Sequence, residues 1–212
     1  MPLSLNLSAT LNVSRLLYQP SLCLPHAVVP TFDKLVIPFS LSHPENQPQS
    51  EETTDKKPNI KAVVLDKDNC FAKDHDDKVW PAYQQTWKSL VDNYPKGNIL
   101  IVSNSAGTDD DVDHQQAKKL ENDTGVTVLR HSTKKPGCHE EIMAYFAKVG
   151  ITDPSQIVVI GDRLFTDMLM ANMMGAWGIW ISEGVELSQK PFVKLERMFY
   201  SRMAGYGPNY PS

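Results

Sequence analysis

The segment Lys61–Cys70 constrains the fold more than any other part of the chain. It runs from four apolar residues, Ala62 to Leu65, directly into two carboxylates, Asp66 and Asp68, spaced one residue apart. A short apolar run with two valines is typical of a strand that is buried on both faces of a parallel sheet. Because open α/β sheets bind ligands at the carboxyl ends of their strands, both carboxylates are expected at a ligand site.

Two carboxylates this close repel each other, and the repulsion raises the pKa of one of them unless a positive group joins the site. A hard cation such as Mg²⁺ would relieve the repulsion, since it prefers oxygen ligands and keeps part of its coordination for a substrate phosphate. Either Asp could then attack phosphorus as a nucleophile. The alternative interpretation of this stretch alone is a strand followed by an acidic turn that caps a helix.

Length and charge narrow the class of protein. At 212 residues the chain suits one domain plus additional sequence. Its net charge of −4 argues against a general nucleic-acid binder, so nucleic acid is not an expected partner. The three cysteines form no CxxC pair, which favours a reducing compartment. No stretch reaches the roughly 20 apolar residues that a membrane-spanning helix needs.

The N-terminal part differs in composition from the rest. Its first 32 residues contain no Asp or Glu, and Leu3, Leu7 and Leu11 repeat at helical spacing. We expect residues 1–37 to form an apolar amphipathic extension that contacts a membrane surface as a peripheral anchor. The alternatives are that this extension docks on the core of the chain itself or mediates self-association. A polar, proline-rich linker or loop is expected at 38–59, followed by the main domain at 60–212.

The main domain alternates strand-like and helix-like patterns, which predicts an α/β fold with a doubly wound parallel sheet. The expected strands are 61–65, 98–105, 127–130, 156–160 and 177–181, and the expected helices are 80–94, 108–121, 138–149, 168–174 and 192–203.

Polar residues follow several of these strands. Ser103 and Asn104 end the second strand, Asp162 follows the fourth, and the third crossover supplies Lys134 and Lys135. The carboxyl ends of parallel strands lie at one edge of a sheet, so these groups should converge with the two carboxylates of the first strand. From the residues alone, the pattern indicates a metal-dependent phosphomonoesterase.

The chain also resembles the haloacid dehalogenase superfamily of phosphatases, subfamily IIIA, over about 61–181. The motifs that carry this resemblance are Asp66-Lys67-Asp68-Asn69-Cys70, Ser103, Lys135 before Pro136, and Gly161-Asp162 with Asp167. It implies a Rossmann-like core. A single aromatic helix occupies most of the sequence between the first and second motifs, which leaves no room for an inserted cap domain, so we expect an open site.

The resemblance implies a role for each acidic residue. Asp66 would be the nucleophile, and Asp68 would be the general acid and base. Mg²⁺ would be held by Asp66, by Asp68 through its backbone carbonyl, and by Asp162, while Asp167 would support the water shell of the metal.

The phosphate would be bound by residues from two other motifs. Ser103 and Lys135 would contact the phosphate oxygens, and Asn104 is grouped with them. Lys134 is the alternative to Lys135; the latter is favoured because it directly precedes Pro136.

A closer resemblance is to the mitochondrial phosphatidylglycerophosphate phosphatases of fungi and plants, carried by Val64–Asn69, Arg130–Gly137 and Gly161–Asp167. It implies hydrolysis of phosphatidylglycerophosphate to phosphatidylglycerol during cardiolipin biosynthesis. It also implies a peripheral location on the matrix side of the inner mitochondrial membrane, with homo-oligomerisation as an open option.

The sequence also allows other functions. The chain could be a phosphatase of the same superfamily that acts on a soluble sugar, nucleotide or protein phosphate. Two alternatives without catalysis are a receiver-like signalling domain and a lipid-binding scaffold. The last predicted helix, 192–203, mixes apolar residues with Lys194, Arg197 and Arg202. This helix either packs on the core with its cations extended into water, or it attracts lipid headgroups.

Overall fold

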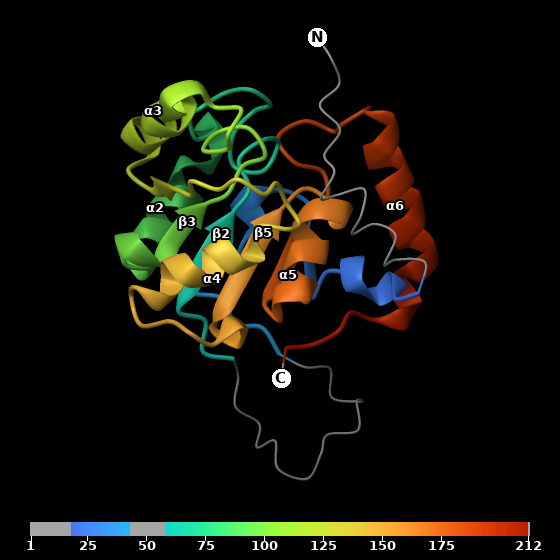
Figure 1. The fold of residues 1–212 in the computed structure, drawn as a ribbon. Helices are drawn as coiled ribbons and strands as arrows, with labels where there is room; N and C mark the ends of the chain where they lie inside the picture. The colour runs from blue at the N-terminus through green and yellow to red at the C-terminus, as the bar shows by residue number, and fades with distance from the viewer. Residues whose placement is uncertain (1–17, 43–57, 212) are drawn as a thin grey trace.

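In the part of the chain that the structure describes, the strands form a six-stranded, fully parallel sheet with the order β1-β6-β5-β2-β3-β4. The computed structural model describes residues 18–42 and 58–211 (Figure 1). The strands are β1 (Ala27–Val29), β2 (Ala62–Leu65), β3 (Ile99–Ile101), β4 (Thr127–Val128), β5 (Ile157–Gly161) and β6 (Trp177–Ile181). All five strands expected from the sequence are present, and the α/β class with a parallel sheet is confirmed.

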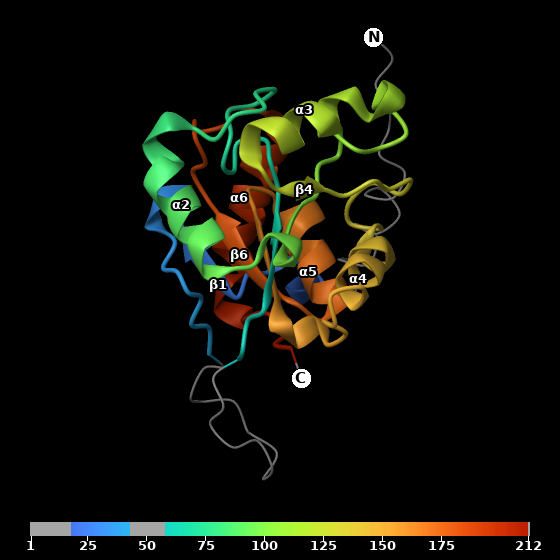
Figure 2. The same cartoon turned by 90° about the vertical axis from the view of Figure 1, so that its left-hand side faces the viewer.

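Helices cover both faces of this sheet. They are α2 (Gln84–Asn93), α3 (Gln115–Thr124), α4 (His139–Ala147), α5 (Leu169–Met174) and α6 (Pro191–Met203). Figure 2 shows α2 on one side of the sheet and α4 on the other, as a doubly wound fold requires. Each expected helix is present, although most are a few residues shorter than predicted.

Side chains of the central strands alternate between two separate apolar cores. In β2, Val63 and Leu65 join the core that contains Trp87 and Leu90 of α2. Val64 instead joins the second core, on the side of α4 and α5. Because both faces of the sheet are covered by helices, both sets of positions are apolar, which explains the unbroken apolar run that marks β2 in the sequence.

The edge strand β1 was not predicted, and it corrects the expected domain boundary. Ala27–Val29 pairs in parallel with Ile179–Ile181 of β6, and the backbone N–H of Gly178 donates to Nδ1 of His26 at 2.8 Å. Residues 18–37 therefore belong to the α/β domain instead of forming a separate extension. The physical reason is that β6 would otherwise leave its hydrogen-bonding edge unpaired.

The described start of the expected linker also packs on the domain. Phe39 is buried, its ring lies 5.7 Å from that of Tyr94, and its backbone N–H donates to the Tyr94 hydroxyl at 3.3 Å. The rest of the linker, at 43–57, and the leucine stripe of residues 1–17 lie outside the described residues. None of the helices that the structure describes is both long and apolar enough to cross a membrane.

Candidate active site

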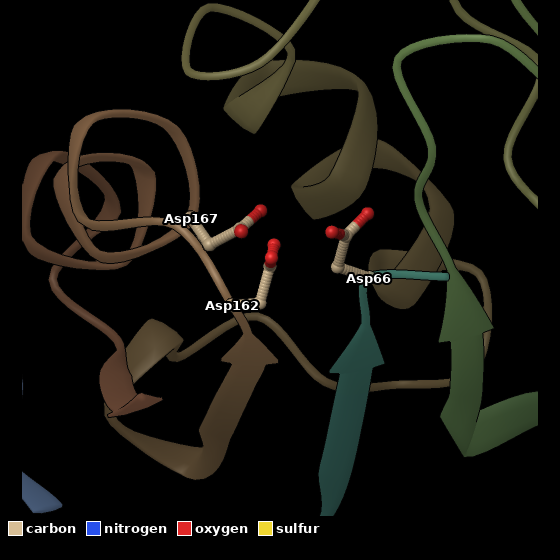
Figure 3. Close-up of side chains that lie close together, drawn as sticks. All are labelled: Asp66, Asp162 and Asp167. Atoms are coloured by element: carbon tan, nitrogen blue, oxygen red, sulfur yellow. The ribbon is translucent and has the colours of Figure 1, made fainter. Parts of the chain in front are cut away.

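Three carboxylates meet above the carboxyl ends of β2 and β5 (Figure 3). One oxygen each of Asp66, Asp162 and Asp167 lies within 4.8 Å of the other two. We call these residues the carboxylate cluster. Asp66 and Asp167 are buried and Asp162 is partly buried. Oxygen ligands at this separation suit a small hard cation, so the donor set fits the metal expected from the sequence.

Local backbone geometry brings the cluster together. Asp66 continues the β2–β5 ladder through its N–H, which donates to the carbonyl of Ile160 at 2.8 Å. Asp167 lies in a π-helical turn, η8 (Leu164–Met168), and such turns are frequent at functional sites. A Cβ at Gly161 would lie 2.4 Å from the Asp167 carboxyl carbon, so only glycine allows this approach.

Lys135 places a positive charge between two members of the carboxylate cluster. Its ammonium donates to Asp66 Oδ1 at 2.6 Å and to Asp167 Oδ1 at 2.7 Å, and its side chain is almost fully buried. Lys134, the alternative considered from the sequence, instead pairs with the exposed carboxylate of Asp110. The geometry therefore places Lys135, and not Lys134, among the carboxylates.

Burial and mutual repulsion make the cluster dependent on positive charge. Burial raises the pKa of Asp66 to about 7, although the adjacent Lys135 ammonium opposes the shift. Burial also raises the pKa of Asp162, with further contributions from Asp66 and Asp167. Burial alone would lower the pKa of Lys135, but the carboxylates beside it raise it overall. A divalent cation would satisfy the charge that one ammonium leaves uncompensated.

This arrangement predicts a pH dependence of stability for the metal-free protein. Because the pKa of Asp66 rises from 3.8 to about 7 on folding, the folded state binds more protons than the unfolded state in this interval. The contribution of Asp66 to the free energy of unfolding should therefore fall as pH rises from about 4 to 7. Thermal unfolding in EDTA, compared between wild type and Asp66→Asn, isolates this contribution. An advantage of wild type that grows with pH across this window would contradict the prediction.

Asp68 lies at the rim of the cluster and is oriented by groups outside it. Its Oδ1 accepts from Lys67 Nζ at 2.7 Å and from the backbone N–H of His75 at 2.8 Å. Lys67 is itself buried and donates to the carbonyl of Asp76 at 2.8 Å. Asp68 lines the same cavity as Asp66, but its carboxylate is not part of the cluster.

The residues expected to bind phosphate lie at different depths. Asn104 lines the cavity, and its Oδ1 accepts from the backbone N–H of Lys135 at 2.7 Å. Ser103 is fully buried, and its hydroxyl oxygen lies 3.0 Å from that of Ser105, which is exposed and lines the cavity. Direct contact of Ser103 with phosphate therefore stays a prediction, and Ser105 is a lining residue that sequence reasoning missed.

The cavity has a volume of about 240 Å³ and opens beside the start of α6. Besides the acidic residues, it is lined by Arg163, Lys190 and Phe192, among others. The guanidinium carbon of Arg163 lies 4.2 Å from the ring centroid of Phe192. Sequence reasoning gave none of these three residues a role in the site. Lys190 and Phe192 come from a segment that follows the last strand, and Arg163 lies inside the Gly161–Asp167 motif beside the residues that received roles.

Two further residues, Asn69 and Glu196, hydrogen-bond to Asp162 and to its neighbour Arg163. Asn69 donates from Nδ2 to Asp162 at 3.2 Å and accepts from the backbone N–H of Glu186 at 3.0 Å. Glu196 of α6 is buried and accepts from Arg163 Nε at 2.8 Å. Asn69 could have been found from its place beside Asp68. Glu196 gave no signal, since it lies 33 residues from Arg163 in the sequence.

Comparison with known proteins places this geometry in a family context. Residues 7–186 match the family described as mitochondrial PGP phosphatase. The chain is 53% identical over 198 residues to phosphatidylglycerophosphatase GEP4, mitochondrial, of Saccharomyces cerevisiae, covering 93% of this chain and 98% of that protein. It is 32% identical over 195 residues to the probable phosphatidylglycerophosphatase, mitochondrial, of Schizosaccharomyces pombe, covering 91% and 90%. The matched residues include all six strands and the whole carboxylate cluster.

Proposed function

Because this chain belongs to the mitochondrial PGP phosphatase family, it is a phosphatidylglycerophosphatase, and we propose that it works through an aspartyl-phosphate on Asp66. The reaction converts phosphatidylglycerophosphate and water to phosphatidylglycerol and inorganic phosphate, a step of cardiolipin biosynthesis. The observation that carries the chemistry is the buried contact between Asp66 and Lys135 at an open cavity.

The metal in this proposal is Mg²⁺. Asp66, Asp162 and the backbone carbonyl of Asp68 would hold it, and Asp167 would support its water shell. Bound there, Mg²⁺ would neutralise charge on the phosphate oxygens and offset the repulsion within the carboxylate cluster. The proximity of three carboxylates supports this assignment.

In the first half of the reaction, a carboxylate oxygen of Asp66 attacks phosphorus, and the bond from phosphorus to the glycerol oxygen breaks. Asp68 gives its proton to that leaving oxygen, so the glycerol oxygen of phosphatidylglycerol departs as a hydroxyl group and not as an alkoxide. Asn104 and Lys135 hold the phosphate oxygens, with Ser103 either joining them or acting through Ser105. Lys135 also keeps Asp66 in position through the hydrogen bond to Oδ1.

In the second half, Asp68 takes a proton from water, and the resulting nucleophile attacks the phosphorus of the aspartyl-phosphate. The bond between phosphorus and the Asp66 oxygen breaks, which releases inorganic phosphate and restores the carboxylate. The contacts from Lys67 and His75 to Asp68 support this role, because they fix the side chain at the cavity rim.

The place of the enzyme in the cell follows from its relatives and its substrate. The names of the fungal relatives include the word mitochondrial, and we take this chain to be mitochondrial as well. We propose a peripheral position on the matrix side of the inner membrane, with the first 17 residues contributing membrane contact. Self-association is compatible with this arrangement.

A substrate comparison tests the proposed function. Purified protein with Mg²⁺ should release phosphate from phosphatidylglycerophosphate in mixed micelles far faster than from glycerol 3-phosphate, a nucleotide or a phosphopeptide at equal concentration. A preference for any of the soluble phosphates would refute the lipid substrate but would still be consistent with phosphatase activity. Loss of phosphate release in EDTA, with recovery on adding Mg²⁺, is part of the expected result.

Asp162→Asn should weaken metal binding. We expect the Mg²⁺ concentration for half-maximal activity to rise at least about tenfold and the maximal rate to fall, because a charged ligand is replaced by a neutral one. Titration of Mg²⁺ against phosphate release measures both effects. Asp109→Asn, at an exposed position, is the matched control and should behave as wild type. An unchanged Mg²⁺ requirement in Asp162→Asn would exclude this residue as a ligand.

A further inference from the structure

Helix α6 and the loop before it expose several large apolar side chains. Leu187, Leu195 and Met198 are 57%, 51% and 45% exposed. Leu195 and Met198 are three residues apart, so they lie on one side of the helix, together with the exposed Arg202 four residues further on. We define the α6 face as Lys194, Leu195, Met198 and Arg202.

The orientation of this face is fixed by the opposite side of the helix. Val193 and Glu196 are buried there, and Glu196 accepts hydrogen bonds from Arg163 Nε and from the backbone N–H of Phe165. The Trp180 and Tyr200 rings are 4.9 Å apart, which holds the second half of the helix on β6. The outward position of Leu195 and Met198 is therefore set by specific buried contacts.

The charge of the α6 face is opposite to that of the chain. The protein carries a net charge of −4, yet Lys194 and Arg202 of the face are both basic and exposed. Glu196 is the one acidic residue in the sequence of α6, and it is buried in an ion pair with Arg163. The outward surface of α6 thus combines apolar side chains with positive charge, the combination that anionic bilayers bind.

The same helix borders the active site. Phe192 and Val193 at its first turn line the cavity that holds Asp66, and so does Lys190, which pairs with Asp74 at 2.5 Å. Figure 1 shows α6 along one flank of the molecule, entered from the edge of the sheet where the strands end. Phe192 is exposed, lines the cavity and lies three residues before Leu195, so a bilayer in contact with the α6 face would lie next to this part of the cavity rim.

We propose that the α6 face binds the surface of an anionic lipid bilayer and so presents the cavity to phosphate at headgroup level. The proposal rests on the proposed function for its consequence, delivery of a lipid substrate. The binding itself follows from the exposed apolar side chains, their fixed orientation and their positive surroundings. It is separate from any contact made by residues 1–17.

Vesicle flotation of the full chain tests the proposal. The probes are vesicles of phosphatidylcholine alone and of phosphatidylcholine with phosphatidylglycerol, both without substrate. Leu195→Glu/Met198→Glu should bind the anionic vesicles at least about tenfold more weakly than wild type, since it places acidic groups where apolar contact is expected. The matched control is Val112→Glu/Val149→Glu, which changes two exposed valines on other elements and should leave binding unchanged.

Two measurements exclude other occupants of the face. The variant should keep the melting temperature and the rate on a soluble aryl phosphate, because neither Leu195 nor Met198 lines the cavity. A large drop in melting temperature would mean that the chain itself covers the face, and a change in oligomeric state by sedimentation would mean that a second copy does. Either result, or vesicle binding equal to the control, would overturn the proposal.

Failure of the proposed function would look different. In that case wild type would still float with anionic vesicles through the α6 face, but it would not hydrolyse phosphatidylglycerophosphate in mixed micelles. Lys194→Glu/Arg202→Glu adds a check on charge: its loss of binding should be confined to the anionic vesicles and should shrink as salt is added. Equal binding of this variant and wild type to anionic vesicles would remove the electrostatic part of the proposal and overturn it as stated.

Discussion

Replacing Asp66 with Asn is expected to lower turnover by about 10⁴-fold or more, because the substitution removes the nucleophile of a covalent mechanism. The fold should survive, and the metal-free variant should be at least as stable as wild type above pH 7. The reason is that burial raises the pKa of Asp66 to about 7, so its charged form is disfavoured in the folded protein. Phosphate release from a soluble aryl phosphate and thermal unfolding in EDTA measure the two effects.

A matched variant separates loss of the nucleophile from loss of the metal. Both variants remove a proposed ligand, but only Asp66→Asn also removes the nucleophile. The activity of Asp66→Asn should therefore not return at saturating Mg²⁺, whereas that of Asp162→Asn should return in part. Trapping of a covalent phosphoenzyme by acid quench should succeed with wild type and fail with Asp66→Asn. Turnover by Asp66→Asn within tenfold of wild type would refute the aspartyl-phosphate.

Replacing Lys135 with Met is expected to have the largest effect on stability. The ammonium lies 2.6 Å from Asp66 and 2.7 Å from Asp167, both buried, and its loss leaves carboxylates without their partner. Breaking a buried pair in this way typically costs about 3–5 kcal/mol. Activity should also fall by about 10²- to 10³-fold, since one group that offsets charge on the phosphate is lost. Chemical denaturation and phosphate-release assays measure these quantities.

The neighbouring lysine provides the control. Lys134 pairs with the exposed carboxylate of Asp110, so Lys134→Met should change the free energy of unfolding by less than about 1 kcal/mol. Added Mg²⁺ should recover part of the stability lost in Lys135→Met, because a cation again faces the carboxylates. If the two variants were equally stable in EDTA, Lys135 would not hold the cluster together.

The central strands could be predicted because each is a continuous apolar run in the sequence. The runs at 62–65, 157–161 and 177–181 are apolar on both faces, and each is buried throughout. β1 could not be predicted in this way. It is three residues long, its side chains are only partly buried or exposed, and a proline follows it directly. Its strand conformation depends on pairing with β6, a partner that local sequence does not reveal.

The residues of the candidate site likewise fall into two groups: those that could be predicted from the sequence and those that depend on tertiary packing. The residues at strand ends converge because parallel strands end at one edge, so the proximity of Asp66 and Asp162 follows from topology alone. The contacts of Asp68 with Lys67 and His75 depend on how one loop folds back, and the buried pair of Glu196 and Arg163 depends on where the last helix docks. Loop geometry and docking are set by tertiary packing, which residue spacing does not encode.

The edge strand β1 is made early in synthesis, but the sheet is complete only when β1 has paired with β6, which is made much later. The hydrogen bond from Gly178 to His26 joins residues 152 positions apart, and contacts of such long range form slowly. A chain that enters a compartment N-terminus first would carry β1 unpaired until β6 had followed. The strands that bear Asp66 and Asp162, β2 and β5, pair with each other directly and need neither β1 nor β6 to do so. The catalytic centre could thus be assembled while the last edge of the sheet was still open to other chains.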